Sequence, residues 1–226
     1  VLIGSYVASQ MVNNVSLGVG IVFLFFGGFF IAKWGAKKTT VIWSWLSIAV
    51  AVVTILFCLF LGGPEGMKKI GVMGVPVIIY TVLTLLKSSA SMVLTATNGA
   101  RAADVTDYEY MRSGNYLPAV VSATYSFIDK AVSSLGSLVA TGCVALVGYV
   151  NTVPQMGDKA TWPIFWMGMF LMFGLPILGW ILNVISMKFY ILDKEKMVEV
   201  QKTLAERKKE VEAMEAEAAK ESSDEA

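Results

Sequence analysis

Apolar runs of about 20 residues recur along this chain, and they constrain the fold more than any other feature. A run of that length crosses a hydrocarbon layer of about 30 Å as an α-helix, whereas soluble cores rarely need one so long. Hydrophobic residues make up 56% of the chain, and the charged ones concentrate in short connections and a C-terminal tail. The sequence therefore predicts an all-α protein that crosses a membrane several times.

The pattern predicts five membrane-spanning helices preceded by the end of another. Residues 1–12 are predicted to be the end of a truncated first helix, and Asn13-Asn14 the turn that follows it. The later helices are predicted at residues 16–32, 41–61, 70–98, 117–150 and 162–187, with a polar connection from Arg101 to Asn115. Because the chain begins inside an apolar stretch without an initiator Met, we expect it to be a fragment.

Positive charge sets the expected orientation, because short loops rich in Lys and Arg stay in the cytoplasm. Most such residues fall on one side of the predicted membrane: Lys33, Lys37, Lys38, Arg101, Arg112 and Lys188. We therefore expect residues 1–190 to form the bundle, in a cell (inner or plasma) membrane. Residues 191–226 are the expected cytoplasmic tail.

The tail is rich in Glu, Lys and Ala, with apolar residues such as Met197, Val200 and Leu204 at helical spacing. This pattern predicts an exposed helix with a disordered end. A coiled coil that binds a partner is the alternative, but it needs several uninterrupted heptads, which the tail lacks.

Composition excludes several classes of function. The chain has no histidine, and its two cysteines, Cys58 and Cys143, lie in apolar segments, so neither a metal site nor His-based catalysis is predicted. The net charge of +1 gives no basic surface for nucleic acid. Asp104 and Asp107 could suggest an intramembrane aspartyl protease, but no second acidic motif matches them, and we expect no enzyme.

Two apolar segments carry polar residues every three or four positions, which places those residues on one face of a helix. The first stripe is Thr84, Lys87, Ser88, Ser91, Thr95 and Asn98, and the second is Ser122, Ser126, Asp129, Lys130, Ser133, Ser137 and Thr141. Hydroxyl residues also serve close helix packing, which is the alternative for the Ser and Thr positions. Charges gain nothing from such packing, so the stripes favour a water-filled path.

Asp129 and Lys130 are the strongest functional candidates. They lie near the middle of their apolar segment, where a charge costs about 3 kcal/mol to insert. Lys87 is expected at similar depth, so Asp129 could neutralise it while Lys130 pairs with an acidic residue outside this chain. The alternative for Lys87 is snorkelling to an interface.

The stretch Ala103-Asp104-Val105-Thr106-Asp107-Tyr108-Glu109, then Ser113-Gly114, then Phe127-Ile128-Asp129-Lys130, resembles the glycoside-pentoside-hexuronide:cation symporters (melibiose permease-like). Gly28, Lys33, Gly35 and Lys37 look like a degenerate copy of the G-x-x-x-D-R-x-G-R-K loop of major facilitator transporters, with Ala32 in place of the acid.

The resemblance implies the C-terminal six-helix half of a twelve-helix major facilitator fold. Cargo then binds between two halves that rock around it, and the cation-binding carboxylates lie mainly on the N-terminal half, beside Lys130. Ser91, Thr95, Ser126 and Ser133 join Lys87, Asp129 and Lys130 in the expected pathway. Asp104, Asp107, Glu109 and Arg112 are implied to form salt bridges of a cytoplasmic gate, and an ordinary solvated loop is the alternative.

The sequence thus predicts a sodium:galactoside symporter-like transporter that couples a sugar or glycoside to a monovalent cation, sodium or a proton. No other cofactor is expected. The expected partners are the bilayer and the N-terminal half of the same transporter. A nucleoside, lipid or organic acid is the alternative cargo, and a non-transporting membrane scaffold is the third interpretation.

Overall fold

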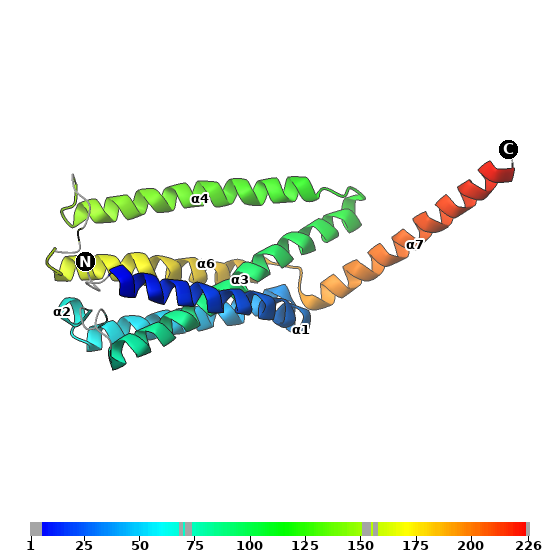
Figure 1. Cartoon of the computed structure of the whole chain (residues 1–226). Helices are drawn as coiled ribbons and strands as arrows, with labels where there is room; N and C mark the ends of the chain where they lie inside the picture. The colour runs from blue at the N-terminus through cyan, green and yellow to red at the C-terminus, as the bar shows by residue number, and fades with distance from the viewer. Residues whose placement is uncertain (1–5, 68–69, 71–73, 151–154, 156–157, 225–226) are drawn as a thin grey trace.

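The computed structural model describes residues 6–67, 70, 74–150, 155 and 158–224. The described residues are helical and include no strand, which confirms the all-α prediction (Figure 1). The elements are α1 (Tyr6–Phe60), α2 (Gly63–Met67), α3 (Val75–Ser113), α4 (Pro118–Leu146), α5 (Trp162–Met169), the π-helical turn η2 (Phe170–Gly174), α6 (Leu175–Phe189) and α7 (Lys194–Asp224).

Helix α1 is folded in two at Gly35, whose φ of 81° and ψ of 160° are not helical. The Thr39 hydroxyl donates to the carbonyl of Phe30 at 3.1 Å although nine residues separate them, so the chain reverses here. Glycine adopts a positive φ without the steric cost that a Cβ brings. The two limbs of α1 are therefore residues 6–34 and 36–60, and Figure 1 shows the chain running out and back.

The predicted turn at Asn13-Asn14 is wrong, because α1 continues through both residues. Asparagine only mildly disfavours a helix, and neither Gly nor Pro stands beside the pair. Four described helices are long and apolar enough to cross a membrane, Val12–Phe60, Val75–Ser113, Pro118–Leu146 and Trp162–Phe189. The fold at Gly35 divides the first of them, which makes five apolar limbs among the described residues, and from Tyr6 onward the predicted end of a truncated helix is part of the first limb.

The polar connection predicted from Arg101 to Asn115 is also wrong over most of its length, because α3 remains helical to Ser113. No Gly or Pro interrupts residues 101–113. The helix ends at Gly114, whose φ is 74° and whose N–H donates to the carbonyl of Tyr110 at 3.0 Å. The acidic residues of this segment therefore stand on a rigid helix.

The limbs of α1 pack against α3 through small residues. A Cβ added to Gly27 would lie 2.7 Å from the Cβ of Ala96, closer than real Cβ atoms approach. Close approach through small residues is typical of helices packed in membranes. A hydrophobic cluster of Ala51, Cys58, Met67, Ile70, Tyr80, Phe165, Met169 and Phe173 then joins α1, α3, α5 and η2 at the end near α2. We call this the far end of the bundle.

Helix α4 differs from its neighbours because none of its residues is buried. Figure 1 shows α4 and α3 diverging from the turn that joins them, so that α4 stands apart from α1 and α6 along most of its length. The end of the bundle with this turn, Gly35 and the start of α7 is here called the tail end.

The tail helix α7 was expected to be exposed along its whole length, but its start is buried. Leu192, Met197 and Val200 are buried, and they pack against Val105, Tyr108 and Met111 of α3. The exposed helix was predicted from charge, but the apolar spacing of Met197, Val200 and Leu204 makes a stripe that α3 covers. Beyond this contact α7 extends away from the bundle (Figure 1).

Candidate functional site

An open cavity of about 820 Å³ lies between α3, α4 and α6. We call it the α3–α4–α6 cleft. Its polar lining consists of Asn98, Arg101, Tyr125, Ser126, Asp129, Asn183 and Ser186. The two charges in the lining are Arg101 from α3 and Asp129 from α4.

Arg101 is held on the wall of this cleft by neutral amides. Its guanidinium donates to Oδ1 of Asn183 at 3.2 Å and to Oδ1 of Asn98, and Asn183 lies within 3.5 Å of the hydroxyl of Ser44. The Nε atom of Arg101 is buried and has no partner among the described residues. Because arginine stays protonated in proteins, this wall keeps a positive charge. The chain of contacts joins α3, α6 and α1.

Arg101 and Asn183 were not among the site residues predicted from the sequence. Arg101 was assigned to a connection, and Asn183 lies in an apolar span whose other polar side chain close by is Ser186. The three-residue step from Asn98 to Arg101 continues the first polar stripe, and that signal could have found the arginine.

Asp129 lines the cleft from α4, and its side chain is exposed. No described ion pair joins it to Lys87, so the expected Asp129–Lys87 pair is not formed. The ammonium group of Lys87 lies instead 4.7 Å from the ring centroid of Phe173 in η2, at cation–π distance. The pair is absent because α4 diverges from α3 (Figure 1), while Phe173 of η2 lies beside Lys87.

Lys130 follows Asp129 and points about 100° around the helix from it. Its side chain is exposed, does not line the cleft and has no ionic partner in the described part of the chain. Ser126 and Ser133 are likewise exposed. The hydroxyl of Ser137 donates to the carbonyl of Ser133 at 3.2 Å, so the Ser137 hydroxyl is satisfied within α4. The stripe on α4 is therefore uncovered by the rest of this fold.

Ser91 and Thr95 on α3 are exposed as well. The hydroxyl of Thr95 donates to the carbonyl of Ser91 at 3.1 Å. Neither residue lines the α3–α4–α6 cleft, so the structure does not bring them together with Asp129.

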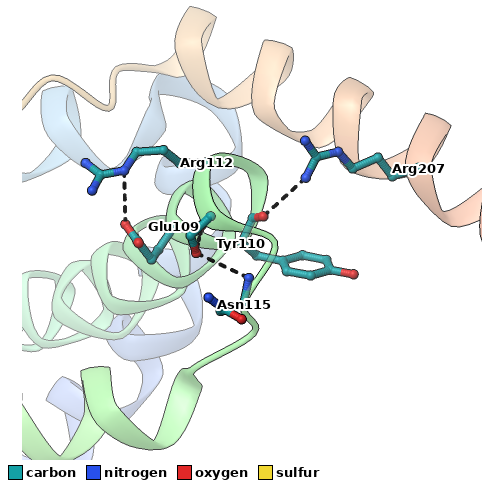
Figure 2. A network of polar contacts seen from close by, with 6 residues as sticks. Glu109, Tyr110, Arg112, Asn115 and Arg207 are labelled. Carbon is teal, nitrogen blue, oxygen red and sulfur yellow. Dashed lines mark hydrogen bonds and ion pairs between the residues drawn. The ribbon is translucent and has the colours of Figure 1, made fainter.

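The four expected gate residues lie on the last turns of α3. The hydroxyl of Tyr190 donates to Asp104 at 3.3 Å, and burial, followed by the charge of Asp104, raises the pKa of Tyr190 above its ordinary value. Glu109 and Arg112 form an exposed pair at 3.7 Å within one helix turn, which Figure 2 shows. Such pairs contribute little stability. Asp107 is half-buried and joins no ion pair among the described residues.

The tail helix touches the same region. The guanidinium of Arg207 in α7 donates to the carbonyl of Tyr110 at 3.4 Å (Figure 2). In the same view the backbone N–H of Asn115 donates to the hydroxyl of Ser113 at 3.2 Å, where the chain leaves α3. The end of α3 is therefore held at two points, Asp104 by Tyr190 just after α6 and Tyr110 by Arg207 of α7.

The residues of the degenerate loop motif surround the hinge of α1. A Cβ on Gly35 would lie 3.0 Å from the Cβ of Lys194, and the ammonium of Lys194 donates to the carbonyl of Lys33 at 2.9 Å. Gly28 has open space around its Cα, and Lys37 is half-buried. Gly35 thus serves both the reversal of the chain and the approach of α7.

Metal-ligand groups are scarce in this fold. Among the described residues, no group of three or more His, Cys, Asp or Glu side chains could hold a metal ion. Cys58 and Cys143 are both free thiols.

A family model described as MFS/sugar transport protein matches residues 1–194. No curated protein and no solved structure matches the chain significantly. The matched region contains every apolar limb and ends at the first residue of α7.

Proposed function

This chain belongs to the MFS/sugar transport protein family of the major facilitator superfamily, and from that premise we propose that it is a cation-coupled symporter of a sugar or glycoside. Family membership makes it a multi-pass membrane transporter of a small molecule, located in a lipid bilayer. The coupling ion, sodium or a proton, and the carbohydrate cargo are the proposal. So is the glycoside-pentoside-hexuronide:cation symporter subfamily.

The uncovered stripe of α4 is the observation that carries the proposal. Asp129 and Lys130 lie near the middle of a 29-residue helix, where each charge costs about 3 kcal/mol to insert into a bilayer. Nothing in the described fold buries or pairs them. We propose that the stripe faces a water-filled path, with the N-terminal half of the same transporter on its other side.

In this mechanism Lys130 pairs with carboxylates of the N-terminal half while the cation site is empty. A bound sodium ion or proton neutralises those carboxylates and releases the ammonium group. Cargo then binds more tightly to the neutralised site, which is a coupling free energy between the two ligands. The two halves rock around the cargo between two populated states.

The α3–α4–α6 cleft and the end of α3 complete the proposal. Asp129 and Arg101 supply an acceptor and a donor for cargo hydroxyls on opposite walls of the cleft. At the tail end, Asp104, Asp107, Glu109 and Arg112 make the gate, on the cytoplasmic side of a cell membrane. Lys87 supports the bundle through Phe173, while Ser91, Thr95, Ser126 and Ser133 line the path.

The test is uptake into vesicles driven by an imposed sodium or proton gradient. Lys130→Ala is expected to abolish accumulation of cargo above its external concentration. Without the ammonium group of residue 130, the bound cation has no charge to displace from the carboxylates, and coupling is lost. Lys159→Ala is the matched control, an exposed lysine outside the apolar limbs. Accumulation at the wild-type level in Lys130→Ala refutes the coupling mechanism.

A second cargo class, an organic acid, is favoured by one observation. The guanidinium of Arg101 is held by neutral groups, the amides of Asn98 and Asn183 and the sulfur of Met187, so it remains able to bind a carboxylate in bidentate geometry. Uptake of a panel of sugars and organic acids by wild type and Arg101→Gln separates the two cargoes. A sugar transporter is expected to lose affinity modestly, whereas an organic acid transporter loses nearly all uptake.

A further inference from the structure

A second cavity, of about 350 Å³, lies at the tail end where α1 reverses and α7 begins. Lys37 and Lys38 from α1 and Lys194 from α7 supply its positive charge. Its remaining walls include Trp34 and Ile42. We propose that this cavity binds the phosphate group of an anionic phospholipid from the leaflet on the tail side.

The charges of the cavity suit a phosphate. Lys37 and Lys38 have no ionic partner within the described part of the chain. Lys194 gives one of its three N–H groups to the carbonyl of Lys33 at 2.9 Å, which fixes its ammonium at the rim and leaves two donors. These donors come from two helices that are distant in sequence, so the fold itself assembles them.

Two carboxylates also lie in the lining, Asp193 and Glu195. Asp193 is already engaged, because its Oδ1 accepts the backbone N–H of Lys196 at 2.9 Å in the first turn of α7. Glu195 is exposed and sits beside Lys194 in the chain. Three ammonium groups against two carboxylates leave the lining with one excess positive charge, which a phosphodiester neutralises.

The apolar flank of the cavity distinguishes a lipid from a soluble phosphate. Ile42 in the wall is 47% exposed, and Trp45, about one turn deeper in the same apolar limb, is 57% exposed. Trp34 forms a rigid side, because its ring stacks on Phe30 with 5.1 Å between centroids. Lysines at a membrane surface beside exposed apolar side chains match a headgroup and its acyl chain together.

A lipid at this position would bridge the hinge of α1 and the start of α7. Gly35 touches Lys194 closely, and the lipid phosphate would add contacts from Lys37 and Lys38 to the same junction. This lipid site involves neither the cargo nor the coupling ion, so it is independent of the proposed transport mechanism.

The test is thermal unfolding of the purified full-length protein in dodecyl maltoside, titrated with dioleoylphosphatidylglycerol. Wild type is expected to gain stability with a saturating dependence on the lipid. A lysine at an anionic surface is worth about fivefold in affinity, the equivalent of about 1 kcal/mol. The double variant Lys37→Gln/Lys38→Gln is therefore expected to bind the lipid about 25-fold more weakly. The double variant Lys37→Arg/Lys38→Arg is expected to keep most of the affinity.

The matched control is Lys188→Gln/Lys202→Gln, which removes two exposed lysines outside the cavity. It is expected to respond to the lipid as wild type does. An equal loss in this control indicates general surface attraction and overturns the proposal, as does a wild-type response in Lys37→Gln/Lys38→Gln. Inorganic phosphate at matched concentration is expected to give no stabilisation, and equal stabilisation by phosphate also overturns it.

A second measurement does not depend on removing lysines. Phosphatidylglycerol with brominated acyl chains is expected to quench tryptophan fluorescence with a saturable component at low mole fraction. The variant Trp34→Phe is expected to lose that component. An unchanged saturable component in Trp34→Phe contradicts a lipid in this cavity.

Discussion

The second limb of α1 and helix α4 share a pattern of hydroxyl residues but lie in opposite environments. Both are apolar helices with hydroxyl residues every three or four positions. In α1 the residues Thr40, Ser44, Ser47 and Thr54 are fully buried, whereas in α4 the residues Ser122, Ser126, Ser133 and Ser137 are exposed.

Hydrogen bonding does not distinguish these two stripes. The hydroxyl of Ser47 donates to the carbonyl four residues earlier at 2.8 Å, and that of Ser137 does the same at 3.2 Å. Both hydroxyls are thus satisfied within their own helix. The difference lies in what covers the helix: α3 and α6 pack on α1, and nothing in the described fold buries α4. A hydroxyl stripe alone therefore indicates a close-packed helix as readily as a transport path, and the charges on α4 make the distinction.

The largest expected effect comes from the same substitution at a packed glycine of α1, in its first limb, and at an uncovered glycine of α4. Gly27→Leu in α1 is expected to lower the free energy of unfolding by about 3 kcal/mol, because its side chain would overlap Ala96. Gly136→Leu in α4 meets nothing within 4 Å and should leave stability unchanged. Unfolding in detergent micelles measures both, and similar losses at the two sites would show that α4 is packed after all.

A smaller contrast is expected between the two serine stripes. Ser47→Leu places a large side chain in a fully buried position and should cost about 2 kcal/mol of unfolding free energy. Ser137→Leu is expected to cost less than about 0.5 kcal/mol, since its position is exposed. The serine in α4 should instead affect uptake, so stability and transport measured on both variants sharpen the comparison. Impaired folding in Ser137→Leu is the contrary result.

The contact between the α6–α7 connection and α3 extends the packed side of the molecule, and Tyr190→Phe tests it. Losing the hydrogen bond to Asp104 is expected to cost about 1 kcal/mol. Because the pKa of Tyr190 is raised in the folded state, its contribution persists below the ordinary tyrosine pKa of 10.0. Above that pH the unfolded chain releases the phenol proton first, so stability falls as pH rises. The free energy of unfolding, measured against pH in the alkaline range, should fall less steeply for Tyr190→Phe than for wild type. Identical slopes in the two proteins would contradict the contact.

The smallest effect is expected after the end of α4, where the hydroxyl of Tyr149 donates to Asp158 at 2.7 Å. The backbone N–H of Gln155 and then this hydroxyl lower the pKa of Asp158, and the hydrogen bond raises the pKa of Tyr149. The contact is therefore complete above the ordinary aspartate pKa of 3.8 and is lost as pH falls through the lowered value. Asp158→Asn is expected to return the pKa of Tyr149 toward normal without changing the melting temperature. NMR titration of the tyrosine ring measures this shift.

Part of the site could be predicted from the sequence because charges in apolar segments are costly wherever they fold. Asp129 and Lys130 were found in this way, and Asp129 does line a cavity. Arg101 and Asn183 were not found, because their importance comes from a contact between α3 and α6. The pair between Asp129 and Lys87 failed for the same reason, since equal depth on two helices does not bring them together.

The sequence by itself determined that the chain is helical, that it crosses a membrane and roughly where its apolar limbs lie. Length and hydropathy are local properties, and a bilayer allows few alternatives to a helix. Only the tertiary structure decided that the start of α7 is buried against α3 and that α4 stands uncovered. These features depend on which helix faces pack together. The periodicity of one helix predicts that it has a distinct face, but it does not predict which element covers that face.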